Sequence, residues 1–154
     1  MSSTALSPTV RGVTTSGTVS AGFIFANNSE TEIDFEFSGH TFSTPFPETL
    51  YMVNWNNRDP STGPTDHEFT STVTTVPGLN QEFKTYQFEW NKDGIIFTVD
   101  GIPQVIHRTD MPQARAHFMM NHWGTNNPDE FGGKATIGVE RYLYVDWVKY
   151  TPES

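Results

Sequence analysis

The chain has 154 residues, enough for one domain that buries roughly two-thirds of its unfolded surface and too few for two ordinary domains. Asp and Glu number 18 against 9 Lys and Arg, and the formal net charge of -9 argues against a nucleic-acid partner. The absence of Cys excludes disulfide scaffolds, thiol catalysis and cysteine-ligated zinc. No apolar run approaches the roughly 20 residues of a membrane-spanning helix, so no membrane partner is expected.

Residues 1–9 are small and polar without periodicity, and we expect a frayed or disordered N-terminus there. From residue 10 onward, β-branched and aromatic runs alternate with turn-forming clusters, which predicts one all-β domain over 10–154. The expected strands are 18–26, 31–38, 49–56, 67–75, 85–91, 94–100, 103–107, 116–123 and 142–150. Hairpin turns at 91–94 and 100–101 favour antiparallel pairing, and many short strands without a repeat indicate a β-sandwich or jelly roll.

The expected strand at 32–37 alternates acidic with apolar residues, so one face carries Glu32, Asp34 and Glu36 while the other must point to the core. Neighbouring like charges lower stability, which suggests a functional reason for them. Retaining glycoside cleavage needs a nucleophilic carboxylate and a protonated carboxylic acid about 5–5.5 Å apart. Crowding raises the pKa of one carboxyl, and we expect Glu36 to hold the proton.

The acidic pattern alone leaves two other interpretations open: a solvated strand face, and a calcium site built from the same oxygens. The same alternation groups Met52, Asn54 and Asn56 on one strand, and Met119, Asn121 and Trp123 on another. We therefore expect one sheet to have a polar and aromatic outer face. The five His residues show no metal-binding spacing.

The segment 32–37 resembles the active-site strand of glycoside hydrolase family 16, in the form found in bacterial licheninase-type endo-β-glucanases. The resemblance runs from about residue 10 to residue 150. Later segments match landmarks of that family in the same order: His67-Glu68, 85–90, 99–101, 119–124 and 144–150.

The resemblance implies a concanavalin A-like jelly roll with the acids on its concave sheet. It implies that Glu32 is the nucleophile, Asp34 the residue that tunes it and Glu36 the general acid/base. It also implies substrate-binding side chains, in keeping with the stacking of aromatic rings on sugars and the two-way hydrogen bonding of amides. These are Phe23, Phe25, Asn54, Asn56, Asn121 and Trp123.

The expected function is that of a retaining endo-β-glucanase acting on β-1,3-1,4-glucan, β-1,3-glucan or a related β-linked polysaccharide. The alternative is a non-catalytic or vestigial β-glucan-binding domain. No cofactor is required for either, but Asp146 matches a position that contributes to a structural calcium site in licheninases. An extracellular location is implied by the resemblance, although the chain shows no signal peptide.

The chain departs from the family pattern at its beginning, where further N-terminal strands are expected in family members. Their loss would expose a sheet edge, and an exposed edge favours pairing with a second copy of the chain. Asn56 and the segment 38–49 also differ from the licheninase pattern, so the preferred linkage stays open.

Overall fold

The computed structural model describes residues 4–11, 17–26, 31–39, 48–56, 68–112 and 114–151. These residues form ten β-strands, and no helix among them is long and apolar enough to cross a membrane. The strands are β1 (Thr4–Arg11), β2 (Thr18–Phe25), β3 (Glu32–Ser38), β4 (Thr49–Asn56), β5 (Glu68–Thr75), β6 (Lys84–Asn91), β7 (Gly94–Val99), β8 (Ile102–His107), β9 (His117–Gly124) and β10 (Tyr144–Thr151).

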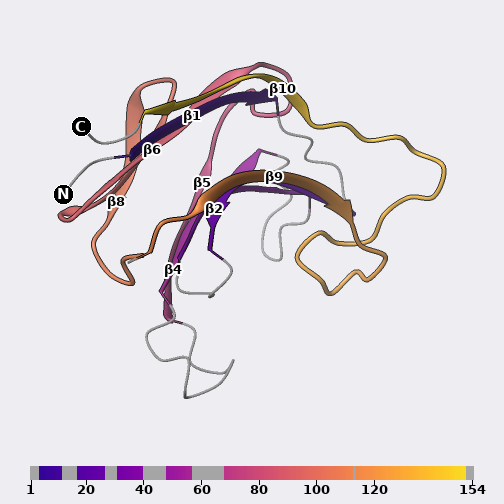
Figure 1. Ribbon diagram of the computed structural model, residues 1–154. Helices are drawn as coiled ribbons and strands as arrows, with labels where there is room; N and C mark the ends of the chain where they lie inside the picture. The colour runs from indigo at the N-terminus through magenta and orange to yellow at the C-terminus, as the bar shows by residue number, and fades with distance from the viewer. Residues whose placement is uncertain are drawn as a thin grey trace.

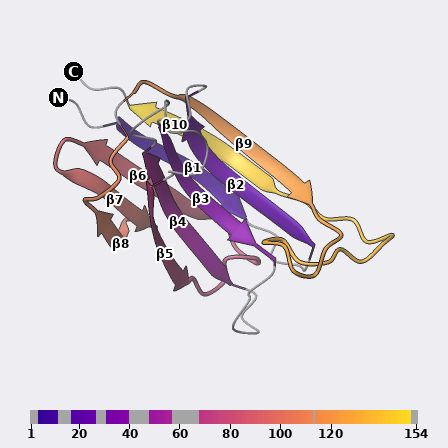
Figure 2. The ribbon, with the colours of Figure 1, turned by 90° about the horizontal axis from the view of Figure 1, so that it is seen from below.

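The strands form two five-stranded sheets that lie face to face (Figure 1). The first sheet has the order β10-β1-β6-β7-β8 and the second has the order β5-β4-β3-β2-β9. Figure 2 shows the second sheet from below, with β3 flanked by β2 and β4. Every pairing is antiparallel, which confirms the predicted all-β antiparallel sandwich.

All nine expected strands are present, with ends within two residues of their predicted positions. Both expected hairpins are also present, joining β6 to β7 and β7 to β8. Asp100 and Gly101 have φ angles of 50° and 77°. Positive φ at both central residues is what a tight two-residue hairpin turn requires, which is why an Asp-Gly pair predicts it so well.

The prediction that residues 1–9 are frayed is wrong for Thr4–Thr9, which belong to β1. This strand lies between β10 and β6 and pairs with both. Its pairing with β6 skips Ser7 and Pro8, in keeping with the missing backbone N–H of proline. The sequence of β1 has little strand character of its own, and two neighbouring edges fix it in place.

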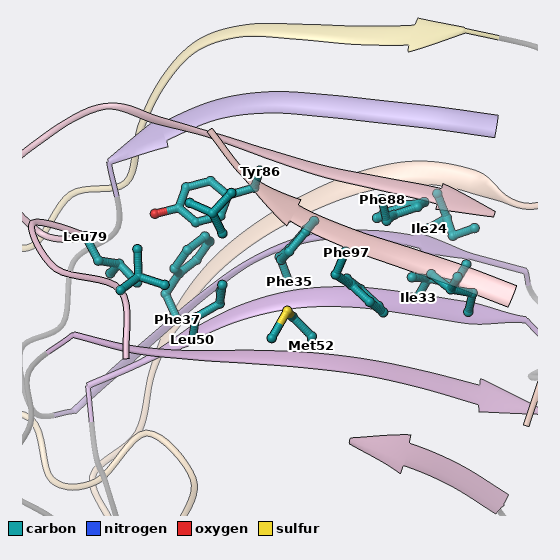
Figure 3. Close-up of a cluster of buried hydrophobic side chains, with 13 residues drawn as sticks. Ile24, Ile33, Phe35, Phe37, Leu50, Met52, Leu79, Tyr86, Phe88 and Phe97 are labelled. Atoms are coloured by element: carbon teal, nitrogen blue, oxygen red, sulfur yellow. The ribbon is translucent and has the colours of Figure 1, made fainter. Parts of the chain in front are cut away.

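The core lies between the sheets, and five of its thirteen buried side chains carry aromatic rings (Figure 3). Phe35 of β3 stands at its centre, making edge-on contacts with Tyr86 and Phe97 at centroid distances of 5.6 and 5.3 Å. Each ring buries a large apolar surface, and such edge-on pairs add about 0.5–1.5 kcal/mol beyond burial. The packing of Phe35 and its neighbours Ile33 and Phe37 fixes which way every side chain of β3 points.

β9 and β10 are outer strands of the two sheets, and no described strand pairs with their outer edges. Every side chain of β10 is exposed, including Tyr144, Trp147 and Tyr150. Between β9 and the segment 141–143 lies an open cavity of about 400 Å³, lined by Met120, Asn121, His122, Arg141, Tyr142 and Leu143. Met120 and His122 point to the inner side of their sheet, so this cavity leads toward the core.

Candidate active site

The three acids of β3 lie in a row on the outer face of the second sheet, hereafter the acid face. The opposite side of β3 is occupied by its core residues, so the alternation predicted from the sequence is confirmed. Pairing with β2 and β4 sets the neighbours of each acid. Glu32 lies between Phe25 and Trp55, Asp34 between Phe23 and Val53, and Glu36 between Ala21 and Tyr51.

Asp34 is the most enclosed of the three acids, with only 4% of its surface exposed. Burial, and then the charges of Glu32 and Glu36, raise its pKa well above the usual range. Its carboxyl group is hydrogen-bonded to the side chains of Glu32 and Trp55. Since two carboxyl groups can share a hydrogen bond only through a proton, Asp34 in its protonated form donates to the carboxylate of Glu32.

Glu36 is the second acid that holds its proton near neutral pH. Burial, and then the charge of Glu32, raise its pKa from 4.5 to about 7. This is the direction expected for a general acid placed beside an ionised carboxylate. The acid face therefore combines an ionised Glu32 with a Glu36 that can both give and accept a proton around pH 7.

Four of the predicted substrate-binding residues share the acid face. Phe23 and Phe25 of β2 lie directly beside the acids, and both are partly exposed. On the far side of β2, β9 places Asn121 opposite Ala21 and Trp123 opposite Val19. The side chains of Asn121 and Trp123 are both exposed, so this flank offers an amide and three aromatic rings to a ligand.

The predicted substrate-binding roles of Asn54 and Asn56 are wrong, because both residues belong to the inner side of β4. They alternate with Trp55, which faces the acids, and their exposed fractions are 0% and 5%. Asn54 accepts a hydrogen bond from Nδ1 of His107 at 2.6 Å, and its Nδ2 donates to the carbonyl oxygens of Thr109 (3.0 Å) and Asp110 (2.7 Å). Its role is structural.

The hydrogen bonds of Asn54 belong to a buried network that ties three strands and a turn together. Because Asn54 Oδ1 can only accept, His107 carries its proton on Nδ1 and its Nε2 accepts from Thr72 at 2.8 Å. Burial lowers the pKa of His107, which keeps the ring neutral. Thr70 donates to Asp110 Oδ2 at 2.6 Å and fixes the turn that follows β8.

The structure brings to the acid face several residues that the sequence analysis did not select. Tyr51, Val53 and Trp55 of β4 are the direct neighbours of the acids. Trp55 stacks at a tilt on Phe69 of β5, with ring centroids 4.6 Å apart, and Phe69 is 53% exposed. The signal that could have found them is the apolar pair Leu50 and Met52, which assigns the even-numbered positions of β4 to the core.

A loop after β9 crosses the Glu36 end of the acid face. Phe131 contacts the ring of Tyr51 edge-on, with centroids 4.8 Å apart. Its carbonyl oxygen accepts a hydrogen bond from Ser38 Oγ at 2.5 Å, and the carbonyl oxygen of Gly132 accepts from Gly17 N at 2.6 Å. A Cβ at position 132 would lie 2.3 Å from Thr125 Cγ2, so glycine is needed for this close approach.

The predicted calcium ligand Asp146 lies on β10, in the sheet opposite the acid face. Among the residues that the structure describes, no group of three or more His, Asp or Glu side chains could hold a metal ion. These residues by themselves do not form a calcium site around Asp146, and the calcium ion stays a prediction. Of the predicted family landmarks, His67 lies outside the described residues.

Comparison with known proteins agrees with the acid face. The family model described as "Glycosyl hydrolases family 16" matches residues 4–148. The chain belongs to this family. It is 30% identical over 139 residues to a beta-glucanase of Paenibacillus polymyxa and 28% identical over 139 residues to a beta-glucanase of Bacillus subtilis. Each match covers 88% of this chain, which spans about half the length of these relatives (53% and 52%).

Solved structures of family 16 enzymes share the fold. The beta-glucanase of Bacillus licheniformis superposes with a TM-score of 0.77 at 22% identity, over 98% of this chain and 67% of that one. A lichenase derived from a mouse hindgut metagenome gives a TM-score of 0.75 at 20% identity, over 99% of this chain and 67% of that one. The predicted membership of family 16 and the predicted jelly-roll fold are thus confirmed.

Substitution of Asn54 tests its structural role. N54A leaves the Nδ1–H group of the buried His107 and two carbonyl groups without their partner, so we expect the free energy of unfolding to fall by about 1–3 kcal/mol. Urea unfolding measures this change. The matched variant N126A alters an exposed amide, and its effect should stay within about 0.5 kcal/mol. A wild-type stability for N54A would contradict the assignment.

The raised pKa of Glu36 predicts a pH-dependent stability. The folded chain binds a proton at Glu36 up to about pH 7, whereas the unfolded chain releases it near pH 4.5, so stability falls as pH rises between these values. E36Q removes this term. Allowing for partial exposure of Glu36, we expect E36Q to be about 2–3 kcal/mol more stable than wild type at pH 8 and nearly equal to it at pH 4.

Urea unfolding of both chains across this pH range gives the measurement. E82Q serves as the control, because Glu82 lies outside the acid face and its side chain is 70% exposed. A difference between E36Q and wild type that does not change with pH would show that Glu36 titrates normally.

Proposed function

We propose that this chain carries the active site of a retaining endo-β-glucanase that hydrolyses β-1,3-1,4- or β-1,3-glucan by double displacement. The proposal rests on one observation: Glu36 has a pKa of about 7 and lies on the same face of β3 as the negative charge of Glu32. Residues two apart on one strand lie about 7 Å apart, so two residues four apart reach each other only by leaning inward over the one between them. The side chains of Glu32 and Glu36 are long enough to do this over Asp34.

In the first step, the Glu32 carboxylate attacks the anomeric carbon of the sugar and forms a glycosyl ester. The bond from that carbon to the glycosidic oxygen breaks, and Glu36 transfers its proton to this oxygen as the leaving sugar departs. Asp34 holds Glu32 in place through the hydrogen bond between their carboxyl groups. Because Asp34 is itself protonated, it supports Glu32 without adding a second charge beside the nucleophile.

In the second step, Glu36 is an ionised carboxylate and removes a proton from water. The water oxygen attacks the anomeric carbon, the ester bond breaks, and Glu32 returns to its carboxylate form. A pKa near 7 suits both halves of this cycle, because the same group must first donate and then accept a proton. Aromatic side chains on either flank, such as Phe23 and Trp55, offer surfaces for stacking sugar rings.

A non-catalytic β-glucan-binding domain is the second candidate function. The outer edge of β9, with which no described strand pairs, favours it, because β9 carries Asn121 and Trp123 at the border of the acid face. Loose positioning of these residues would weaken catalysis more than binding, since precise placement supplies much of an enzyme's rate.

Sugar release separates the two candidates. We expect the wild-type chain to release reducing sugars from barley mixed-linkage glucan or laminarin, and E32Q to lower the rate by a factor of about 10⁴ or more, because it removes the nucleophile. The rate should also fall as pH rises above about 7, where Glu36 loses its proton. E82Q, with the same chemical change outside the acid face, should keep the wild-type rate.

An unaltered rate in E32Q would end the assignment of the nucleophile. If a cooperatively folded wild-type chain releases no sugar, and if wild type and E32Q are retarded equally in a gel that contains mixed-linkage glucan, the binding function replaces the catalytic one.

We further propose that two copies of the chain pair through β10. This edge strand exposes five large apolar side chains by 38–60% each: Tyr144, Val145, Trp147, Val148 and Tyr150. In its pairing with β1, Val145 lies opposite Val10 and Trp147 opposite Thr9, so Asp146 is the extra residue of a β-bulge. Antiparallel pairing of two β10 strands around a twofold axis at Val148 places Asp146 and Trp147 opposite the partner's Lys149. The arrangement forms two symmetric pairs of opposite charge.

Charge exchange on β10 tests this pairing. We expect sedimentation equilibrium to show a wild-type dimer, and K149D to weaken it about tenfold or more, because each Asp146 then faces a second acid. The double exchange D146K/K149D should restore the dimer. K92D is the control, since Lys92 lies in the exposed β6–β7 hairpin and its side chain is 62% exposed. A monomeric wild type, or a dimer indifferent to K149D, would contradict the proposal.

A further inference from the structure

Tyr51 is the one aromatic residue directly across from Glu36. In the second sheet Glu36 lies between Ala21 of β2 and Tyr51 of β4. Ala21 offers no side chain that could hold a sugar, whereas Tyr51 offers a ring face and a hydroxyl group. A sugar that Glu36 protonates on its β4 side would therefore lie beside Tyr51.

The ring of Tyr51 is supported from outside the sheet. Phe131 contacts it edge-on at a centroid distance of 4.8 Å. The backbone of the loop that carries Phe131 is tied to the ends of β3 and β2 by hydrogen bonds from Ser38 Oγ and Gly17 N. Tyr51 is partly exposed, and a ring held in this way loses little conformational entropy when it binds a ligand.

We propose that Tyr51, supported by Phe131, binds the sugar on the leaving-group side of the cleaved bond. The inference rests on the proposed function, since it takes Glu36 as the proton donor.

The electrostatics of Tyr51 agree with this placement. Burial, and then the negative charge of Glu36, raise the pKa of Tyr51 above its ordinary value of 10. Its hydroxyl group therefore keeps its proton at every pH at which Glu36 works, and it can donate a hydrogen bond to a sugar oxygen. The same effect shows that the Glu36 carboxylate is close enough to Tyr51 to change the pKa of its hydroxyl group.

The first experiment compares two substrates that differ only on the leaving-group side. Barley mixed-linkage glucan has a sugar there, whereas an oligoglucosyl fluoride has only a fluorine atom. We expect Y51A to lower kcat/KM about tenfold on the glucan and to leave the fluoride almost unchanged, because only the glucan loses a stacking partner. Y51F keeps the ring and should keep most of the rate. F83A, which removes an exposed aromatic side chain just before β6 of the opposite sheet, serves as the control.

The second experiment needs no turnover and uses chains that also carry E32Q. Calorimetry with a mixed-linkage glucan hexasaccharide should give a Kd about tenfold higher for E32Q/Y51A than for E32Q. Equal losses on the glucan and the fluoride, or an unchanged Kd, would overturn the role of Tyr51. If wild type turns over neither substrate while the Kd still rises, catalysis fails but the binding role of Tyr51 stands.

Discussion

The acid face depends on the burial of the other side of the same strand. Ile33, Phe35 and Phe37 are almost fully buried, and each contributes about 2–3 kcal/mol of apolar burial. Against this stands the cost of ionising a crowded and buried carboxyl group. The raised pKa of Glu36, caused first by its burial and then by the charge of Glu32, represents about 3 kcal/mol above pH 7. The apolar burial of the three core side chains outweighs this cost, and the alternation along β3 therefore holds the acids together on the opposite face.

The same two effects favour protonation of the acids, which relieves their crowding. Burial favours the neutral form of Asp34 and Glu36, and the charge of Glu32 favours it further. A neutral Asp34 can donate a hydrogen bond to Glu32, so the contact between the two carboxyl groups becomes attractive instead of repulsive. The arrangement suits an enzyme that must keep one carboxylate ionised and another protonated within a few ångströms.

Much of this organisation could be predicted from the sequence because local patterns dominate it. Strict alternation fixes the faces of β3, and Asp-Gly chemistry fixes the hairpin between β7 and β8. Crowding of like charges on one strand predicted the direction of the Glu36 pKa shift, although burial in the folded sheet is its larger cause. The two backbone features do not depend on which distant segments pair with each other.

The predictions were wrong where the environment of a residue depends on segments that lie far away in the sequence. β1 has a weak strand sequence and is held by β6 and β10, which come much later in the chain. In β4 both faces carry aromatic or polar residues, and the prediction followed the two Asn residues instead of the apolar pair Leu50 and Met52, which marks the core face. Asn54 faces inward because His107, more than fifty residues later, supplies its buried partner. Sequence patterns show which residues share a face, and pairing across the sheets decides what that face is for.

The acids lie at the centre of their sheet, whereas Asn121 and Trp123 lie on its outer strand β9, so different strands hold the two groups of residues. The proposed chemistry depends on β3 and on its two neighbours, and the pairing of β2 and β4 with β3 is continuous along the acids. The proposed sugar binding depends also on β9, whose outer edge no described strand covers. The proton-holding groups are therefore fixed at the centre of their sheet. The residues proposed to position the polysaccharide, such as Trp123, lie at its border, so changes at that border should alter affinity before they alter the acid–base chemistry.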